Sequence, residues 1–125
     1  MKLTKKQKVA LDELDKSMDE YLEKNKAQMR KERPVFSGVL KYFPDAILEV
    51  AHTSFVGNEQ HHPGTPLHWD KTKSKDEADA LVRHLIQSGI FDDDGVRHTA
   101  KVAWRALALL QREIEADRQN KKSIV

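Results

Sequence analysis

Apolar residues in the first quarter of the chain recur at steps of three and four positions, with charged residues between them. Because residues three and four apart lie on one face of an α-helix, this spacing predicts an amphipathic helix from Thr4 to about Glu32. Thr4 and Gln7 have the spacing of a capping box at its start, and Pro34 suits its end.

The apolar stripe of this helix is narrow, with only one or two positions per turn. Such a stripe is typical of a helix that packs against a partner helix. We therefore expect residues 1–33 to be an oligomerisation element through which the protein forms a homo-oligomer. The stripe consists of Leu11, Leu14, Met18, Tyr21 and Leu22.

A second helix is expected to begin at Phe43-Pro44, because proline suits the first turn, and to end at Val56, because Gly57 suits the position just past a helix end. One face would enter the core, with Ile47, Leu48, Val50, Ala51 and Phe55. The opposite face carries three ionisable groups at helical spacing: Asp45, Glu49 and His52. A solvated face is the alternative for Asp45 and His52, whereas we expect Glu49, between apolar neighbours, to be partly enclosed.

The segment from Asn58 to Lys73 lacks a helical period and is long for a connection, which is typical of functional or disordered loops. We expect Trp69 to order it. Ser74 and Glu77 then give a second capping-box spacing, which opens a third helix that ends near Gly89. Its apolar residues are Ala78, Leu81, Val82, Leu85 and Ile86.

The last helix has the strongest period in the chain and is expected to be the central core helix. Its apolar positions are Val96, Ala100, Ala103, Leu107, Leu110 and Ile114. Three aspartates, residues 92–94, precede it, and the helix dipole explains one of them as a cap. The predicted fold is all-α: a compact bundle of about four helices, with a long ordered His/Trp loop between the second and third. Residues 34–118 form the helical domain and residues 119–125 a polar C-terminal tail.

The amino-acid composition narrows the range of functions that the chain could have. The 125 residues suit a single domain, and the absence of cysteine excludes disulfides, thiolate metal sites and cysteine nucleophiles. There is no apolar run of the roughly 20 residues that a membrane span needs. A formal net charge of +2 gives no argument for a nucleic acid polymer as partner. We expect a cytoplasmic protein without membrane contact.

Hydrolysis of a phosphoanhydride needs carboxylates for Mg²⁺, cations for the phosphates and a group that takes a proton from water. Candidate Mg²⁺ ligands are Glu49, Asp79, Asp92 and Asp94, and candidate phosphate-binding cations are Lys41, Arg83, Lys101 and Arg105. His84 or His98 would assist proton transfer, with Glu49 as a further catalytic candidate. These residues can act together only if the last three helices converge around a shared hollow.

The loop adds candidate ligand-binding residues: His61, His62, His68 and Trp69. Trp69 could stack on a base, and the alternative is that it anchors the loop to the bundle. The histidines lack a recognised zinc spacing, so contacts with a ligand or solvent are favoured. An adjacent His-Asp pair, an EF-hand pattern and a glycine-rich phosphate loop are all missing.

Several motifs in fixed order resemble a known family. They are Phe43-Pro44-Asp45-Ala46, Gln60-His61-His62-Pro63-Gly64, Leu67-His68-Trp69-Asp70, Arg83-His84-Leu85, Asp94-Gly95 with His98, and Ala103-Trp104-Arg105-Ala106-Leu107-Ala108. Together they resemble the phage and prophage domain family of dATP/dGTP diphosphohydrolases, N-terminal type, from about Pro34 to Leu110.

The resemblance implies a helical protein that splits deoxynucleoside triphosphates such as dATP or dGTP to monophosphate and pyrophosphate with a divalent ion. It also implies similarity to the all-helical MazG-type pyrophosphohydrolases, although their paired glutamate motif is missing from the matching region. Two alternatives therefore stay open. One is a non-catalytic binder of a nucleotide or cyclic nucleotide, such as a sponge for host defence signals. The other is an accessory protein that acts through its first helix.

Overall fold

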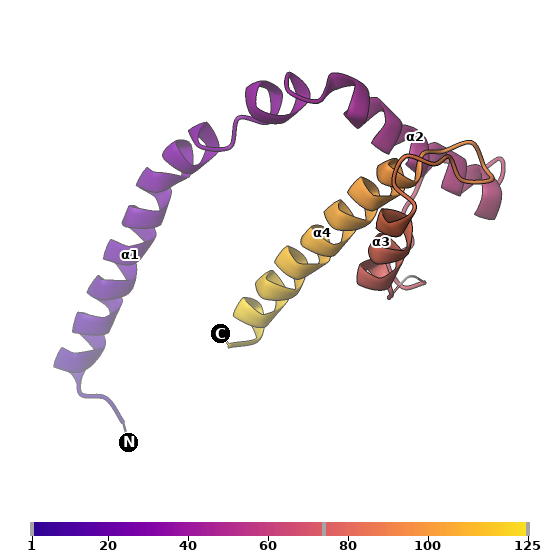
Figure 1. Cartoon of the computed structure of the whole chain (residues 1–125). Coiled ribbons are helices and arrows are strands. Elements are labelled where there is room, and N and C mark those ends of the chain that lie inside the picture. Colours follow the sequence, from indigo (N-terminus) through magenta and orange to yellow (C-terminus); the bar gives the residue numbers. More distant parts are fainter. Residues whose placement is uncertain (1, 74, 125) are drawn as a thin grey trace. The chain divides into compact units, whose positions relative to one another are not determined.

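The computed structural model describes residues 2–73 and 75–124. Four α-helices follow one another, α1 (Lys5–Lys31), α2 (Pro44–His61), α3 (Glu77–Ile86) and α4 (His98–Ile124), with a short π-helix, η1 (Phe36–Leu40), between the first two (Figure 1). The described residues contain no strand, only an isolated antiparallel bridge between Phe91 and Arg97. The prediction of an all-α fold with four helices is confirmed. No described helix is long and apolar enough to cross a membrane.

The chain divides into two compact units, residues 1–42 and 43–125. The boundary lies at the start of α2 rather than after residue 33, so η1 belongs with α1. At the other end, α4 continues to Ile124, and most of the segment expected to be a polar tail is therefore helical.

In the first unit, α1 begins with the predicted capping box. The Thr4 hydroxyl accepts a hydrogen bond from the Gln7 N–H at 3.1 Å, and the Gln7 amide oxygen accepts one from the Thr4 N–H at 3.0 Å. The helix ends at Lys31, shortly before Pro34. Its apolar stripe is exposed, from 45% at Leu11 to 63% at Tyr21.

Helix α2 begins at Pro44 as predicted but continues through Gly57 to His61. The prediction of an end at Val56 is wrong because Asn58, which follows Gly57, holds the helix and the loop together. Its buried side-chain amide donates to the Thr65 carbonyl at 3.0 Å, and its own carbonyl accepts from the His62 N–H at 2.7 Å. The loop folds back at His62 instead.

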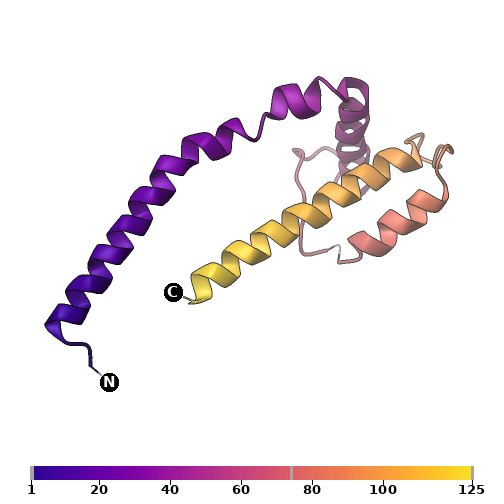
Figure 2. The ribbon, with the colours of Figure 1, turned by 60° about the vertical axis from the view of Figure 1, so that its left-hand side comes forward.

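Helices α2 and α3 both pack against α4, and α3 lies alongside α4 in both views (Figures 1 and 2). The first helical residue of α3 is Glu77 and its N-cap residue is Asp76. The expected partner in a capping box, Ser74, lies outside the described residues. After α3 the chain turns at Gly89, which has a φ of +86°.

The chain reverses between α3 and α4 in a hairpin-like turn. The Asp92 N–H donates to the Val96 carbonyl at 2.8 Å, and the His98 N–H donates to the Ile90 carbonyl at 3.2 Å. Gly95 adopts a φ of +80°, which favours glycine. Helix α4 therefore begins at His98. The three aspartates lie in the connection between α3 and α4, before the first helical residue of α4.

The buried core is small and built around α4. Its buried apolar residues, among those that the structure describes, are Ala80, Val96, Ala100 and Ala108. Small side chains let helices approach closely, but the larger apolar residues beside them stay in contact with solvent. Leu107 and Leu110 are 53% and 52% exposed, so the expected burial of the second half of α4 is wrong. Leu48 and Phe55, also expected in the core, are exposed as well.

We expect Gly57→Ala to raise the free energy of unfolding by about 0.5–1 kcal/mol, because alanine favours a helix interior. A Cβ at Gly57 would meet nothing within 4 Å. Chemical denaturation measures the change. Gly89→Ala is the matched control, and its positive φ should make it destabilising by about 1 kcal/mol. Loss of stability in Gly57→Ala would contradict a helix that runs through this position.

Candidate functional site

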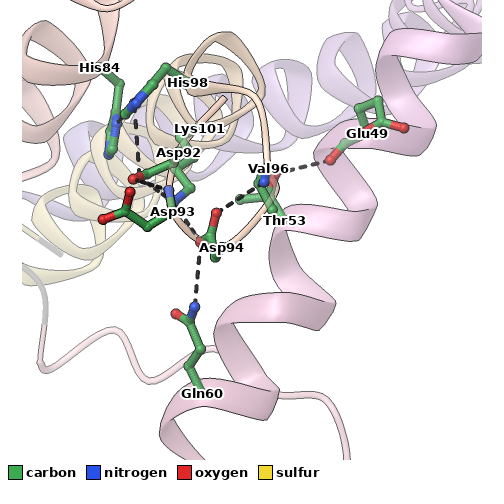
Figure 3. A network of polar contacts seen from close by, with 10 residues as sticks. All are labelled: Glu49, Thr53, Gln60, His84, Asp92, Asp93, Asp94, Val96, His98 and Lys101. Atoms are coloured by element: carbon green, nitrogen blue, oxygen red, sulfur yellow. Dashed lines mark hydrogen bonds and ion pairs between the residues drawn. The ribbon is translucent and has the colours of Figure 1, made fainter. Parts of the chain in front are cut away.

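Two histidines and one aspartate meet where α3 ends and α4 begins (Figure 3). His84 lies in the last turn of α3, Asp92 in the turn, and His98 is the first residue of α4. The two Nδ1 atoms of the histidines are 2.8 Å apart, and His98 Nδ1 is 3.9 Å from Asp92 Oδ2. One ligand atom from each residue lies within 4.8 Å of the others. This His84–Asp92–His98 group has a donor set that could hold a metal ion.

Lys101 ties two aspartates of the turn to α4. Its Nζ atom is 2.7 Å from Asp92 Oδ2 and 2.7 Å from Asp94 Oδ2. The lysine hydrogen bond and then the Asp93 N–H lower the pKa of Asp92. Burial raises the pKa of Asp94, but the Lys101 and Val96 hydrogen bonds outweigh it, so the pKa is lowered. Burial likewise opposes the charge of Lys101, but its two carboxylate partners raise its pKa. All three groups are charged at neutral pH.

The His84 imidazole differs from this charged trio. Burial, followed by the positive charges of Lys101 and His98, lowers the pKa of His84, so its ring is neutral at neutral pH. In the contact between the two Nδ1 atoms, one nitrogen donates a proton and the other accepts it. His98 is buried, with only 4% of its surface exposed. A neutral imidazole offers a nitrogen lone pair, which can accept a proton or bind a metal ion.

Asp94 connects the turn with α2. One carboxylate oxygen accepts a hydrogen bond from the Val96 N–H at 3.0 Å, and the other accepts one from the Gln60 side-chain amide at 3.4 Å (Figure 3). Gln60 is in the last turn of α2, beyond the predicted end of that helix. The longer helix therefore supplies a contact that the sequence prediction missed.

The structure does not bring every predicted carboxylate to this place. Glu49 is exposed on α2 and lies apart from the His84–Asp92–His98 group (Figure 3). Together with Asp45 and Arg97 it lines an open hollow of about 520 Å³ between α2 and the start of α4. Asp79 is exposed on α3. The expected partial enclosure of Glu49 is therefore wrong.

The predicted phosphate-binding cations are also divided. Arg83 pairs with Asp76 at 3.1 Å on the surface of α3. Lys41 belongs to the first unit, where its ammonium group lies 5.6 Å from the centre of the Phe36 ring. Arg105 lies close enough to His84 for its charge to help lower the pKa of that histidine. Lys101 and Arg105 are thus the cations that accompany the group.

The aromatic residues of the loop pack on the bundle. Trp69 contacts Trp104 of α4 edge to face, with ring centres 5.5 Å apart, and the Trp104 indole N–H donates to the Ser54 hydroxyl at 2.7 Å. His62 and His68 contact each other, with ring centres 4.6 Å apart, and His61 is exposed at the end of α2. This geometry agrees with the anchoring interpretation of Trp69.

Glu77 is a buried charge whose role the sequence analysis missed. It is 3% exposed, and its carboxylate pairs with Arg105 at 3.5 Å and Arg112 at 3.1 Å. Arg112 also donates to the Lys71 carbonyl and lies over the Trp69 ring. Glu77 therefore anchors the loop and α3 to α4. The sequence did contain one indication of this ion pair: the two arginines are seven residues apart and therefore lie on one face of α4.

The comparison with protein families gives one description for this chain. The family described as dATP/dGTP diphosphohydrolase, N-terminal, matches residues 23–122, about four fifths of the sequence. The match begins inside α1 and includes the whole His84–Asp92–His98 group. Neither the curated proteins nor the solved structures compared with the chain give a match.

We expect Glu77→Gln to lower the free energy of unfolding by about 2–3 kcal/mol, because it leaves two partly buried arginines without their counter-charge. Urea denaturation measures the loss. Glu115→Gln is the matched control: it removes a carboxylate that is much more exposed than Glu77 and pairs with Lys71 at 2.7 Å, and stability should hardly change. Equal effects of the two substitutions would contradict the anchoring role of Glu77.

Proposed function

This chain belongs to the family of dATP/dGTP diphosphohydrolases, N-terminal, and from that premise we propose that it hydrolyses purine deoxynucleoside triphosphates to monophosphate and pyrophosphate. The observation that carries the proposal is the His84–Asp92–His98 group. It brings a half-buried imidazole, His84, and a buried one, His98, together with a charged carboxylate. We place the attacking water at this group. Its nitrogen and oxygen atoms can hold and orient a water molecule as hydrogen-bond partners.

The reaction itself is a simple displacement. The water oxygen attacks the α-phosphorus, the bond from that phosphorus to the bridging oxygen breaks, and the bridging oxygen leaves with pyrophosphate. The proton lost by the water passes to the solvent. Because the transition state gains little from covalent chemistry, catalysis depends on positioning and on neutralising the phosphate oxygens.

Charge around the group limits how the triphosphate can approach. Asp92 and Asp94 carry two negative charges, and Lys101 supplies one positive charge between them. This trio would repel a bare triphosphate, so the nucleotide must arrive with a cation. We assign Mg²⁺ to that role, bound by the phosphate oxygens that it prefers. We assign Arg105 to the phosphates, because its charge acts on His84 and its contact with Glu77 is long at 3.5 Å.

Tag-free protein incubated with dATP or dGTP and Mg²⁺ should release deoxynucleoside monophosphate and pyrophosphate in equal amounts, as measured by chromatography and a pyrophosphate assay. Asp92→Asn should lower kcat by about a hundredfold, because it removes the charge but keeps the shape. His52→Gln, a change at an exposed histidine on α2, is the matched control and should retain the activity.

A melting-temperature shift recorded with the same nucleotides separates hydrolysis from binding, since a ligand of the folded state raises its stability. A shift without products would replace the proposal with a nucleotide-binding role. Release of inorganic phosphate and a diphosphate instead would contradict attack at the α-phosphorus.

We also propose that α1 joins copies of the chain into a homo-oligomer. Support comes from its stripe at heptad-like spacing, in which Leu14, Met18 and Tyr21 are all more than half exposed. All five residues of this stripe precede the family match, which begins at residue 23.

Light scattering at micromolar concentration should give the mass of a dimer or larger assembly. Met18→Glu should reduce it to the monomer mass, because it places a charge within the stripe. Lys16→Glu introduces the same side chain on the opposite face and should leave the assembly intact. A monomeric parent chain would refute the role of α1 in assembly.

A further inference from the structure

The donor atoms of the His84–Asp92–His98 group suit a different ion from Mg²⁺. Mg²⁺ demands oxygen ligands in near-ideal octahedral geometry. Of the four carboxylates expected to bind it, Glu49 and Asp79 lie outside the group, and Asp92 and Asp94 each give an oxygen to Lys101. Two of the three ligand atoms are imidazole nitrogens, and imidazole favours Zn²⁺ and related transition ions over Mg²⁺.

We propose that His84, Asp92 and His98 form a resident site for one transition-metal ion of the Zn²⁺, Co²⁺ or Mn²⁺ class. The inference deepens the proposed function, because the ion would hold the attacking water in its open position. The binding of the ion, however, does not depend on any nucleotide chemistry.

Distances within the group are close to those that such an ion requires. A tetrahedral ion with bonds of 2.0–2.1 Å holds two nitrogen ligands about 3.3 Å apart. The two Nδ1 atoms are 2.8 Å apart and must open by about half an ångström. His98 Nδ1 and Asp92 Oδ2 are 3.9 Å apart and must close by a similar amount. Side-chain rotations supply movements of this size without a change in the backbone.

The group is buried on one side and open to solvent on the other. His98 is enclosed, whereas the Asp92 side chain is 27% exposed, so solvent reaches the group from the turn. Three protein ligands and one open position for water is the arrangement of catalytic zinc sites, whereas structural zinc sites use four protein ligands. An ion here would also offset the net negative charge that the two aspartates and Lys101 leave beside the group.

Lys101 is the competitor of the proposed ion. Its ammonium group occupies the same Asp92 oxygen that faces the histidines and lies 2.7 Å from it. Removing this positive charge should therefore tighten metal binding. A hydrogen-bonded histidine pair with a purely structural role predicts no such gain.

The test is calorimetric titration of tag-free, chelator-treated protein with Zn²⁺, Co²⁺, Mn²⁺ and Mg²⁺ in the absence of nucleotide. We expect one Zn²⁺ or Co²⁺ per chain, bound at least about a hundredfold more tightly than Mg²⁺. The visible absorption of bound Co²⁺ reports a nitrogen- and oxygen-ligated tetrahedral site independently.

Single-residue variants test whether the ion binds to these three side chains. His84→Gln and Asp92→Asn should each weaken Zn²⁺ binding by about tenfold or more, and two positions are used so that poor folding of one leaves the other as a test. Lys101→Met should tighten binding by about tenfold. His52→Gln, outside the group, should bind like the parent chain. Circular dichroism of each variant confirms that it is folded.

The failures of the two proposals are distinguishable. Absence of stoichiometric Zn²⁺ or Co²⁺ binding, or binding that none of the group's variants weakens, would overturn the metal site whatever the enzymatic result. Hydrolysis of dATP that survives complete removal of transition metals would overturn the role of the ion in holding the attacking water while leaving the proposed function in place. Stoichiometric binding without nucleotide turnover would keep the site and reject the function.

Discussion

The reversal of the chain between Ile90 and His98 sets the positions of the side chains on which the second unit depends. Backbone hydrogen bonds close it at both ends, and Lys101 fastens it to α4 through Asp92 and Asp94. An ammonium group between two carboxylates in a partly buried place is stabilising only if all three stay together, because each alone would pay for its desolvation. The turn is consequently held in one conformation, and the end of α3 faces the start of α4. The meeting of His84 and His98 follows from that arrangement.

A second polar anchor works at the other end of α3. Glu77 connects the first turn of this helix with two arginines of α4, and one of those arginines also contacts the loop beside Trp69. Ion pairs thus fix the first turn of α3 to α4 through Glu77, and they fix the turn that follows α3 to α4 through Lys101. Such a scaffold suits a site made of charged groups, since the same low exposure that strengthens the ion pairs also strengthens the interactions of a bound ion or phosphate.

Much of the fold was predictable because its causes are local. The capping box of Thr4 and Gln7 and the start of α2 at Pro44 depend on neighbouring residues, and the structure has both. Gly57 was misread because its local preference to end a helix is overridden by the contact of Asn58 with a residue seven positions later. The burial of Leu107 was misjudged for a related reason: a helical period shows which residues share a face, but not whether a neighbouring element covers them.

The candidate site shows the same difference between features with local causes and features that depend on distant residues. His84, Asp92, Asp94, His98 and Lys101 were recognisable as candidates from residue type and spacing, whereas their separation from Glu49 and Asp79 depends on how α2 and α3 are rotated about their axes. Glu77 was overlooked because a glutamate in the first turn of a helix ordinarily stays in solvent as a capping residue. Only the position of the arginines on α4, distant in sequence, makes it a buried anchor.

The edge-to-face contact of Trp69 with Trp104 has a practical consequence. These are the two tryptophans of the chain, one in the long loop and one on α4, and they share a single environment. Intrinsic tryptophan emission therefore originates at one place, the junction of loop and bundle. Detachment of the loop alone would expose both indoles to water and shift the emission to the red while the helices, followed by circular dichroism, remained intact. The protein thus carries an optical reporter of loop docking without any added label.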